Sequence, residues 1–429
     1  MATKSETRLP YDLGRGGAGF FLLVLGLLVL VALGVVAYAR QWAEGDVVTG
    51  LRDLGTMGGA PWGLYVAFVV HFVGVSFVGY TVAALIGLFN LDHLRPIARM
   101  ALALTVVSLA LGALSVLADL GQPLRGIVNL FLYARPQSPL FGTFSTVLVG
   151  YMVASLVFLY LDGRRDAALL ARAPSRLRGF YRLWAAGYRD TPEEQDRHRR
   201  TTFWLILAVI PILVVAISTE GFVFGLQSGA AGWGGALQAP GFVVMAGVSG
   251  MGHLIVVAFT ARKLLGLQDR ITLRQFSWLG NVLLVLVAAY LYFIVVEVLT
   301  GIYQAHHHEA RVTRALLVGD YAWLFWLTVG MLVVSFLLLL IQFLRRRYSL
   351  WPIVLSGALV SLAGIGKRYL IVVPSQTHGR LLPYLTGFYS PTWVEYSVVV
   401  GLLALGALAL VLFFRVFPIM EVATREQRR

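Results

Sequence analysis

The sequence contains no cysteine, and only 13% of its 429 residues are charged. Without cysteine the chain can form no disulfide, ligate no iron–sulfur cluster through thiolates, attach no c-type haem and offer no thiol nucleophile. Soluble globular proteins carry about 25% charged residues, so this chain lacks the charge to cover a surface that faces water. Hydrophobic residues make up 58% of it, which excludes a disordered chain. We therefore predict an integral membrane protein.

Ten apolar segments are long enough to cross a bilayer, because a transmembrane helix needs about 20 residues. The segments are 19–39, 61–89, 97–117, 139–161, 201–224, 240–261, 276–300, 321–344, 351–373 and 392–414. Strands of a membrane barrel would alternate polar and apolar residues over about ten positions, and these segments do not. The fold class that follows is an all-α membrane protein with about ten transmembrane helices.

The basic residues predict the orientation of the chain. If the N-terminus is inside, the inside segments hold 26 of the 35 lysine and arginine residues. This bias matches the positive-inside rule, so we expect a multi-pass protein of the cytoplasmic (inner) membrane with both termini cytoplasmic. The net charge of +14 is then a topology signal, and no nucleic-acid partner is expected. The longest inside loop, 162–200, is either a solvated basic linker or contains an amphipathic helix at the lipid headgroups.

A short motif occurs twice and indicates an internal repeat. Gly-Val-Ser stands at 74–76 in the second segment and at 247–249 in the sixth. Small residues at such spacing let helices approach closely, although they are also common in membrane helices without any repeat. We predict two parallel four-helix bundles and two peripheral helices. The predicted divisions are 1–59 (tail, first peripheral helix and outer loop), 60–225 (first bundle with the basic loop), 226–375 (second bundle) and 376–429 (last outer loop, peripheral helix and tail).

Ionisable residues gather in the outer half of the predicted membrane region. They are His71, Asp119, Glu220, Glu297, Lys367 and Arg368. Charged groups inside a bilayer are costly and usually functional. Histidine exchanges protons near neutral pH, and a quinol releases two protons when it gives up two electrons, so a histidine and a carboxylate suit a quinol pocket. Each group also has a structural interpretation: a core histidine, an interfacial carboxylate or salt bridge, or a snorkelling arginine.

Two histidine patterns are not expected to bind a cofactor. The tract His306-His307-His308-Glu309 has consecutive side chains that point in different directions, so they cannot easily surround one tetrahedral metal. Membrane b-type cytochromes hold haem between pairs of histidines on neighbouring helices. In this sequence only His71 and His253 lie well inside predicted spans, and pairs at the spacing of two stacked haems are absent. We predict no metal site and no haem.

Several motifs resemble the NrfD/PsrC family, the membrane subunits of polysulfide reductases. They are Ala-Pro-Trp-Gly-Leu-Tyr at 60–65, Phe-Val-Gly-Val-Ser at 72–76, Asp-Leu-Gly-Gln-Pro-Leu-Arg-Gly at 119–126, Pro-Gln-Ser-Pro-Leu at 136–140 and Arg-Tyr-Leu-Ile-Val-Val-Pro at 368–374. The ten spans resemble the longer members of the family, such as DsrP- and HmcC-like proteins and the quinol-oxidising subunits of alternative complex III.

The resemblance implies a quinone-binding membrane anchor of a respiratory oxidoreductase complex. Such a subunit uses menaquinone or ubiquinone as substrate and carries no haem or iron–sulfur cluster of its own. Its partner is a ferredoxin-like iron–sulfur subunit on the outer face, often with a molybdopterin enzyme or a multihaem cytochrome. By position in the motifs, His71 and Asp119 are the candidate proton acceptors, with Glu220, Glu297 and Arg368 as weaker pocket residues. A secondary transporter and a purely structural anchor remain the alternatives.

Overall fold

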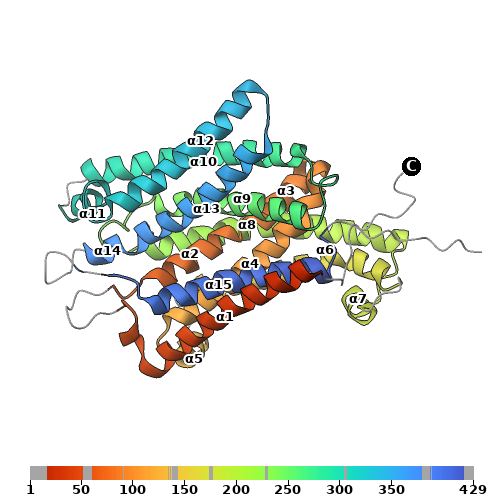
Figure 1. Ribbon diagram of the computed structural model, residues 1–429, viewed down its shortest axis with the longest axis horizontal. Coiled ribbons are helices and arrows are strands. Elements are labelled where there is room, and N and C mark those ends of the chain that lie inside the picture. Colours follow the sequence, from red (N-terminus) through yellow and green to blue (C-terminus); the bar gives the residue numbers. More distant parts are fainter. Residues whose placement is uncertain are drawn as a thin grey trace, which may run out of the picture.

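The molecule is a bundle of long helices that run side by side (Figure 1). The computed structural model describes residues 17–51, 60–89, 91–133, 135, 137, 144–172, 177–227, 230–303, 307–378, 387 and 389–419. Every regular element in these ranges is a helix, and ten spans are long and apolar enough to cross a membrane. The prediction of an all-α membrane protein with ten transmembrane helices is confirmed.

Fifteen α-helices make up the described chain. They are α1 (Ala18–Glu44), α2 (Leu64–Val75), α3 (Val78–Phe89), α4 (Arg95–Asp119), α5 (Pro123–Tyr133), α6 (Ser145–Leu170), α7 (Arg178–Ala185), α8 (Pro192–Gly225), α9 (Gln238–Leu264), α10 (Leu273–Tyr303), α11 (His307–Leu317), α12 (Ala322–Arg345), α13 (Leu350–Val372), α14 (Pro374–Thr377) and α15 (Trp393–Val416). The second span combines α2 with α3, and the ninth combines α13 with α14.

The short helices lie at the two ends of the bundle (Figure 1). Helices α5, α11 and α14 lie at one end, here called the α5 end, and α7 lies at the other, the α7 end. Helix α1 begins and α15 ends at the α7 end, where the Arg415 guanidinium lies 5.2 Å from the ring centre of Phe20. The first and last spans thus have their free ends on one side of the molecule. That this side is cytoplasmic stays a prediction.

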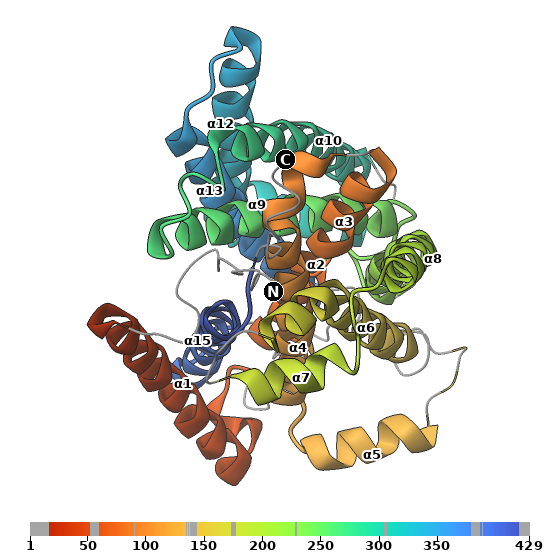
Figure 2. The ribbon, with the colours of Figure 1, turned by 90° about the vertical axis from the view of Figure 1, so that its right-hand side faces the viewer.

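Helix α9 occupies the centre and packs on α2, α8, α10 and α13. Helices α4, α6 and α8 surround α2 and α3 on one side of it, whereas α10, α12 and α13 lie on the other. Helices α1 and α15 pack against each other on the outside (Figure 2). The predicted division into two parallel four-helix bundles stays a prediction, as do its boundaries, and the segments 1–16 and 420–429 lie outside the described residues.

Glycines bring the central helices into backbone contact. A Cβ atom added at Gly250 on α9 would lie 3.0 Å from the Val75 carbonyl oxygen of α2. A Cβ at Gly252 would lie 2.9 Å from the Gly357 carbonyl oxygen of α13. Apolar side chains gain little by leaving lipid for another helix, so close packing of this kind contributes much of the association between spans.

The second span is interrupted between α2 and α3, at Ser76 and Phe77. The Ser76 carbonyl oxygen accepts hydrogen bonds from the Thr105 hydroxyl (2.6 Å) and from the Tyr151 hydroxyl (2.8 Å). A carbonyl freed by a break in a membrane helix needs such partners, because lipid offers none. The interruption is therefore satisfied by side chains of α4 and α6.

Candidate functional site

Buried ionisable side chains meet where α2, α8, α9 and α13 pack together. Helix α2 contributes His71, α9 contributes His253, α13 contributes Arg368 and α8 contributes Glu220. Of these, His71 and Arg368 are each 1% exposed, and Glu220 is 2% exposed. Four helices, of which only α8 and α9 are consecutive in the chain, thus bring titratable groups together inside the bundle, where His253 is only partly buried.

The two histidines are in direct contact. The ring centres of His71 and His253 are 5.0 Å apart, and Phe68 packs edge-on against His71. Nδ1 of His253 lies 2.9 Å from the Ser249 carbonyl oxygen. Because a carbonyl oxygen only accepts, this nitrogen carries a hydrogen and donates the hydrogen bond. Neither ring nitrogen of His71 has a hydrogen-bond partner among the described residues. The imidazole of His71 is therefore available to a ligand or to internal water.

Glycine and serine form the wall beside His71. A Cβ atom at Gly364 on α13 would lie 3.5 Å from Cε1 of His71 and 2.8 Å from Oγ of Ser249. The Ser249 hydroxyl is buried and also lacks a hydrogen-bond partner in the described part of the chain. The small residues of α9 and α13 thus let both helices approach the imidazole.

Arg368 and Glu220 are opposite charges buried in the same region. The Arg368 guanidinium carbon lies 4.3 Å from the ring centre of Phe242, and a Cβ at Gly74 would lie 3.3 Å from one of its terminal nitrogens. Glu220 and Arg368 interact electrostatically, and the Arg368 charge also acts on His71. Within the described residues, none of the three guanidinium nitrogens and neither Glu220 oxygen has a hydrogen-bond partner. Both groups therefore have bonds to offer to a bound molecule.

Lys367 and Glu297 form an ion pair next to this cluster. Lys367 Nζ lies 2.6 Å from Oε2 of Glu297, and the lysine side chain is 4% exposed. Both residues line a cavity of about 250 Å³ between α9, α10, α11 and α13. Phe242 lines the same cavity while it stacks on Arg368. The pair thus borders the buried cluster, with Phe242 in contact with both the cavity and Arg368.

Asp119 belongs to a different polar network, at the α5 end. It is 7% exposed at the end of α4 and interacts electrostatically with Tyr65 in the first turn of α2. The Tyr65 hydroxyl donates to Oε1 of Gln41 (2.8 Å), whose amide donates to the Ala118 carbonyl (3.1 Å). Tyr65 and His71 are six residues apart, which corresponds to about 9 Å along α2.

The start of α2 is held by a buried tyrosine and glutamate. The Tyr389 hydroxyl donates to Oε1 of Glu395 (2.5 Å) and accepts a hydrogen bond from the Leu64 backbone nitrogen (2.7 Å). Burial and the Glu395 carboxylate raise the pKa of Tyr389 above its usual value. Tyr389 therefore stays protonated and keeps donating, which fixes the helix that carries Tyr65 and His71.

Taken together, the structure brings His71 beside His253 and Glu220 near Arg368, and it places Asp119 and Glu297 in two neighbouring networks. Sequence reasoning did not select His253, Ser249, Tyr65 or Gln41 as site residues. The Gly-Val-Ser motif marked the stretch of α9 that contains Ser249, but nothing in it indicated contact with His71. Of the histidine tract, His306 lies outside the described residues, and Glu309 accepts a hydrogen bond from the Gly232 backbone nitrogen (2.6 Å).

Comparison with known proteins gives consistent matches over most of the chain. The family model described as "Polysulphide reductase, NrfD" matches residues 53–378. A putative membrane subunit of the dimethyl sulfoxide reductase of Halobacterium salinarum is 30% identical, over 96% of this chain and 93% of its own length. A subunit of the selenate reductase of Mesobacillus selenatarsenatis is 26% identical over 94% of each chain. An Hdr-like menaquinol oxidoreductase integral membrane subunit of Archaeoglobus fulgidus is 24% identical over 95% of each chain.

Proposed function

The chain belongs to the NrfD family of polysulphide reductase membrane proteins, and from that premise we propose that it binds a quinol or quinone as the membrane anchor of a respiratory oxidoreductase. The relative named as a menaquinol oxidoreductase subunit supports menaquinol as the substrate. The relatives named as reductase subunits support a catalytic partner. Because this chain has no cysteine, the thiolate-ligated cluster that takes the electrons belongs to a ferredoxin-like partner subunit, joined to a molybdopterin enzyme or a multihaem cytochrome.

The observation that carries the proposal is the set of buried polar atoms without partners around His71. Buried polar groups in proteins nearly always make hydrogen bonds, so each exception needs an explanation. The His71 imidazole and the Arg368 guanidinium have no partners among the described residues, and they come from α2 and α13, which pack together. A quinone head group carries two acceptor oxygens and a quinol two hydroxyls, which these side chains are suited to bind.

The chemistry assigns one proton to each of two acceptors. When a quinol is oxidised, two O–H bonds break, two protons leave and two electrons pass to the iron–sulfur partner; reduction reverses each transfer. We assign His71 and Asp119 as the proton acceptors. Asp119 lies nearer the α5 end than His71 does, so the two residues would face opposite ends of the head group. Arg368 would orient a ring oxygen, and Glu220 and Glu297 would exchange protons with the site. General acid–base groups typically contribute roughly 10²–10⁴-fold to a rate.

A secondary transporter is the second candidate, and the interrupted second span favours it. Transporters place substrate and coupling ions at broken helices near the midplane. In this chain the carbonyl of Ser76 at the interruption already accepts two hydroxyl hydrogen bonds, from Thr105 and Tyr151. An ion there would have to displace both hydroxyls, so this carbonyl is not free to bind a coupling ion, and quinol binding stays the first candidate.

Substitution of the two acceptors tests the proposal. His71→Asn and Asp119→Asn should each lower quinol-dependent turnover of the assembled complex on the order of a hundredfold, since each removes a proton acceptor. The partner enzyme should keep its activity with a reduced viologen dye, which delivers electrons without this subunit. His93→Asn and Asp269→Asn make the same chemical changes at the α7 end and should leave turnover unchanged.

Two outcomes contradict the proposal in different ways. Full quinol activity in the double variant would remove both residues from the mechanism. Loss of the assembled complex in both single variants, with His93→Asn and Asp269→Asn intact, would favour a purely structural anchor.

A further inference from the structure

A second hollow lies at the α7 end, far along the bundle from the cluster around His71. It has a volume of about 690 Å³ and lies between α3, α4, α6 and α8. Its lining combines apolar side chains, such as Ile86, Leu102 and Phe158, with charged side chains of both signs, of which Arg99 and Asp166 are buried. An apolar surface beside polar and charged groups matches the division of a lipid molecule into chain and headgroup.

Two hydroxyl groups that line this cavity lack partners. The hydroxyls of Tyr188 and Thr202 are buried, and neither has a hydrogen-bond partner among the described residues. Tyr188 as a whole is 7% exposed. Buried hydroxyls of this kind are normally bonded, so the pair indicates a missing acceptor inside the cavity.

The first turns of two long helices also line the cavity. Helix α4 begins at Arg95 and α8 at Pro192, and both residues are part of the lining. The positive end of each helix dipole favours an anion. The backbone donors are largely used or absent, because Pro192 has no N–H and the Arg95 N–H donates to the Asp92 carbonyl. The Glu194 N–H likewise donates to the Thr191 hydroxyl. Side chains must therefore supply the hydrogen bonds to an anion in this cavity.

The arginines of the cavity fall into two kinds. Arg99 is held inside by Asp162 (2.6 Å) and Asp166 (2.7 Å), with 4% of its side chain exposed. Arg199 pairs with Asp196, but its side chain is 84% exposed. Exposed ion pairs contribute roughly 0–1 kcal/mol, so the Arg199 guanidinium can turn to an anion at little cost, whereas Arg99 serves as fixed wall.

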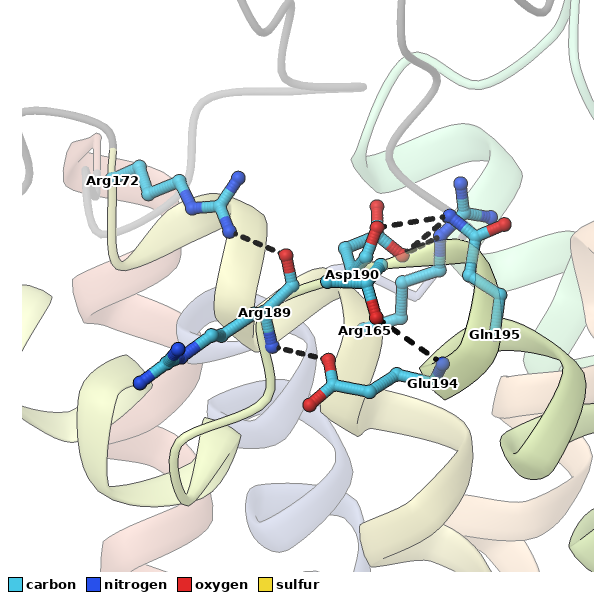
Figure 3. A network of polar contacts seen from close by, with 7 residues as sticks. Arg165, Arg172, Arg189, Asp190, Glu194 and Gln195 are labelled. Carbon is cyan, nitrogen blue, oxygen red and sulfur yellow. Dashed lines mark hydrogen bonds and ion pairs between the residues drawn. The ribbon is translucent and has the colours of Figure 1, made fainter.

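A polar network fixes the segment that carries Tyr188 (Figure 3). Arg165 lies 3.2 Å from Oδ1 of Asp190, and the Arg172 guanidinium donates to the Arg189 carbonyl (2.8 Å). The Arg189 backbone nitrogen donates to Glu194 in the first turn of α8 (2.7 Å). Asp190 has a positive φ of 61°, a conformation that aspartate tolerates better than most residues. The tyrosine is thus held in place before any ligand arrives.

We propose that this cavity binds the phosphate group of a glycerophospholipid. The phosphate oxygens accept hydrogen bonds from the Tyr188 and Thr202 hydroxyls, and the Arg199 guanidinium closes over them. An acyl chain lies along the apolar surface, which opens outward at Phe203, a residue that is 43% exposed. This surface favours a lipid over a free phosphate, which would leave it uncovered.

Native mass spectrometry of the full-length chain in detergent, titrated with phosphatidylglycerol, tests the proposal. The wild type should retain one tightly bound lipid. Hydrogen bonds to charged groups contribute roughly 1.5–3 kcal/mol each, and about 1.4 kcal/mol corresponds to tenfold in affinity. Tyr188→Phe and Thr202→Val should therefore each weaken lipid binding about tenfold or more. Tyr160→Phe, the same change on α6 outside the cavity lining, should bind as the wild type does.

Parallel titrations with inorganic phosphate and glycerol 3-phosphate separate the possible sources of the phosphate. Displacement of the lipid by either compound at equal concentration would overturn the lipid assignment and indicate a soluble phosphate ligand. Unchanged lipid retention in the Tyr188→Phe/Thr202→Val double variant would overturn the site itself. If Tyr188→Phe fails to fold, Thr202→Val alone decides, because valine has nearly the shape of threonine and removes only the hydroxyl.

Discussion

Replacing Glu220 by glutamine should destabilise the protein strongly, because it leaves the Arg368 charge uncompensated. Both side chains are almost fully buried, at 2% and 1% exposure, and the guanidinium has no hydrogen-bond partner among the described residues. Glu220 and Arg368 are not in ion-pair contact, but the Glu220 carboxylate acts electrostatically on the Arg368 charge. Leaving a buried charge uncompensated costs about 3–5 kcal/mol where the two groups are in contact, which is an upper bound here. As a matched control, Glu44→Gln breaks the Arg40–Glu44 pair, whose side chains are 45% and 49% exposed, and should cost at most about 1 kcal/mol.

A double variant separates the stability of the pair from its function. Glu220→Gln combined with Arg368→Met removes both charges, and apolar replacement of a buried pair is often neutral or stabilising. We expect the double variant to regain most of the stability lost in Glu220→Gln, with a coupling well above the roughly 0.5 kcal/mol within which independent sites add. Intrinsic fluorescence during heating in detergent measures this coupling.

Quinol-dependent turnover of the four proteins of this cycle (the wild type, Glu220→Gln, Arg368→Met and the double variant) gives the functional result. If Arg368 orients a ring oxygen, the double variant should fold well and still turn over quinol poorly. Recovery of both stability and turnover would refute a functional role for the pair and make it a purely structural element. A Glu220→Gln single variant as stable as Glu44→Gln would refute the electrostatic argument itself.

Two further substitutions follow from the packing. Gly364→Ala should lower quinol turnover and cost about 1–3 kcal/mol, because the new Cβ would lie 2.8 Å from the Ser249 hydroxyl oxygen beside His71; Gly330→Ala, where nothing lies within 4 Å, should change neither quantity in a parallel melting and turnover assay. Arg99→Met should lower the stability by about 3–5 kcal/mol in the same melting assay, because the buried Asp166 carboxylate then loses its ion-pair partner. Asp166→Asn in the Arg99→Met background should then recover part of the loss, and an unchanged melting temperature in Arg99→Met would show that the pair contributes nothing.

The transmembrane helices could be predicted because a single physical requirement determines them. A helix rises 1.5 Å per residue and the hydrocarbon core is about 30 Å thick, so apolar runs of about 20 residues indicate spans. The short helices give no such signal. Helix α7 lies in the basic loop 162–200, for which a helix was one of two interpretations, and its Trp184 stacks on Phe417 near the other end of the chain. Such a contact depends on tertiary packing that local sequence does not contain.

The members of the site were easier to predict than their neighbours. Ionisable residues inside apolar runs are conspicuous, which is why His71, Glu220 and Arg368 could be selected. The pairing of His71 with Asp119 followed from their positions in the motifs that resemble the family. In the structure, Phe72 and Val73 face Gly112 on α4, whereas His71 faces α9 and α13. Which helix covers each face of α2 depends on the packing of the whole bundle, so the contact with His253 could not be inferred.

The energetic cost of the central cluster is itself an argument for a ligand. Each buried polar group left without a partner costs about 1–3 kcal/mol, and a charged group costs more. The side chains of His71 and Ser249 have no hydrogen-bond partner among the described residues, and Glu220 and Arg368 act on each other only electrostatically. The cluster by itself therefore imposes a penalty that is substantial beside the net stability of a typical domain, about 5–15 kcal/mol. Close glycine contacts among α2, α9 and α13 offset part of it, but they would do so equally well around apolar side chains. A molecule that accepts and donates hydrogen bonds at this position removes the penalty, which a quinol head group does and a lipid chain does not.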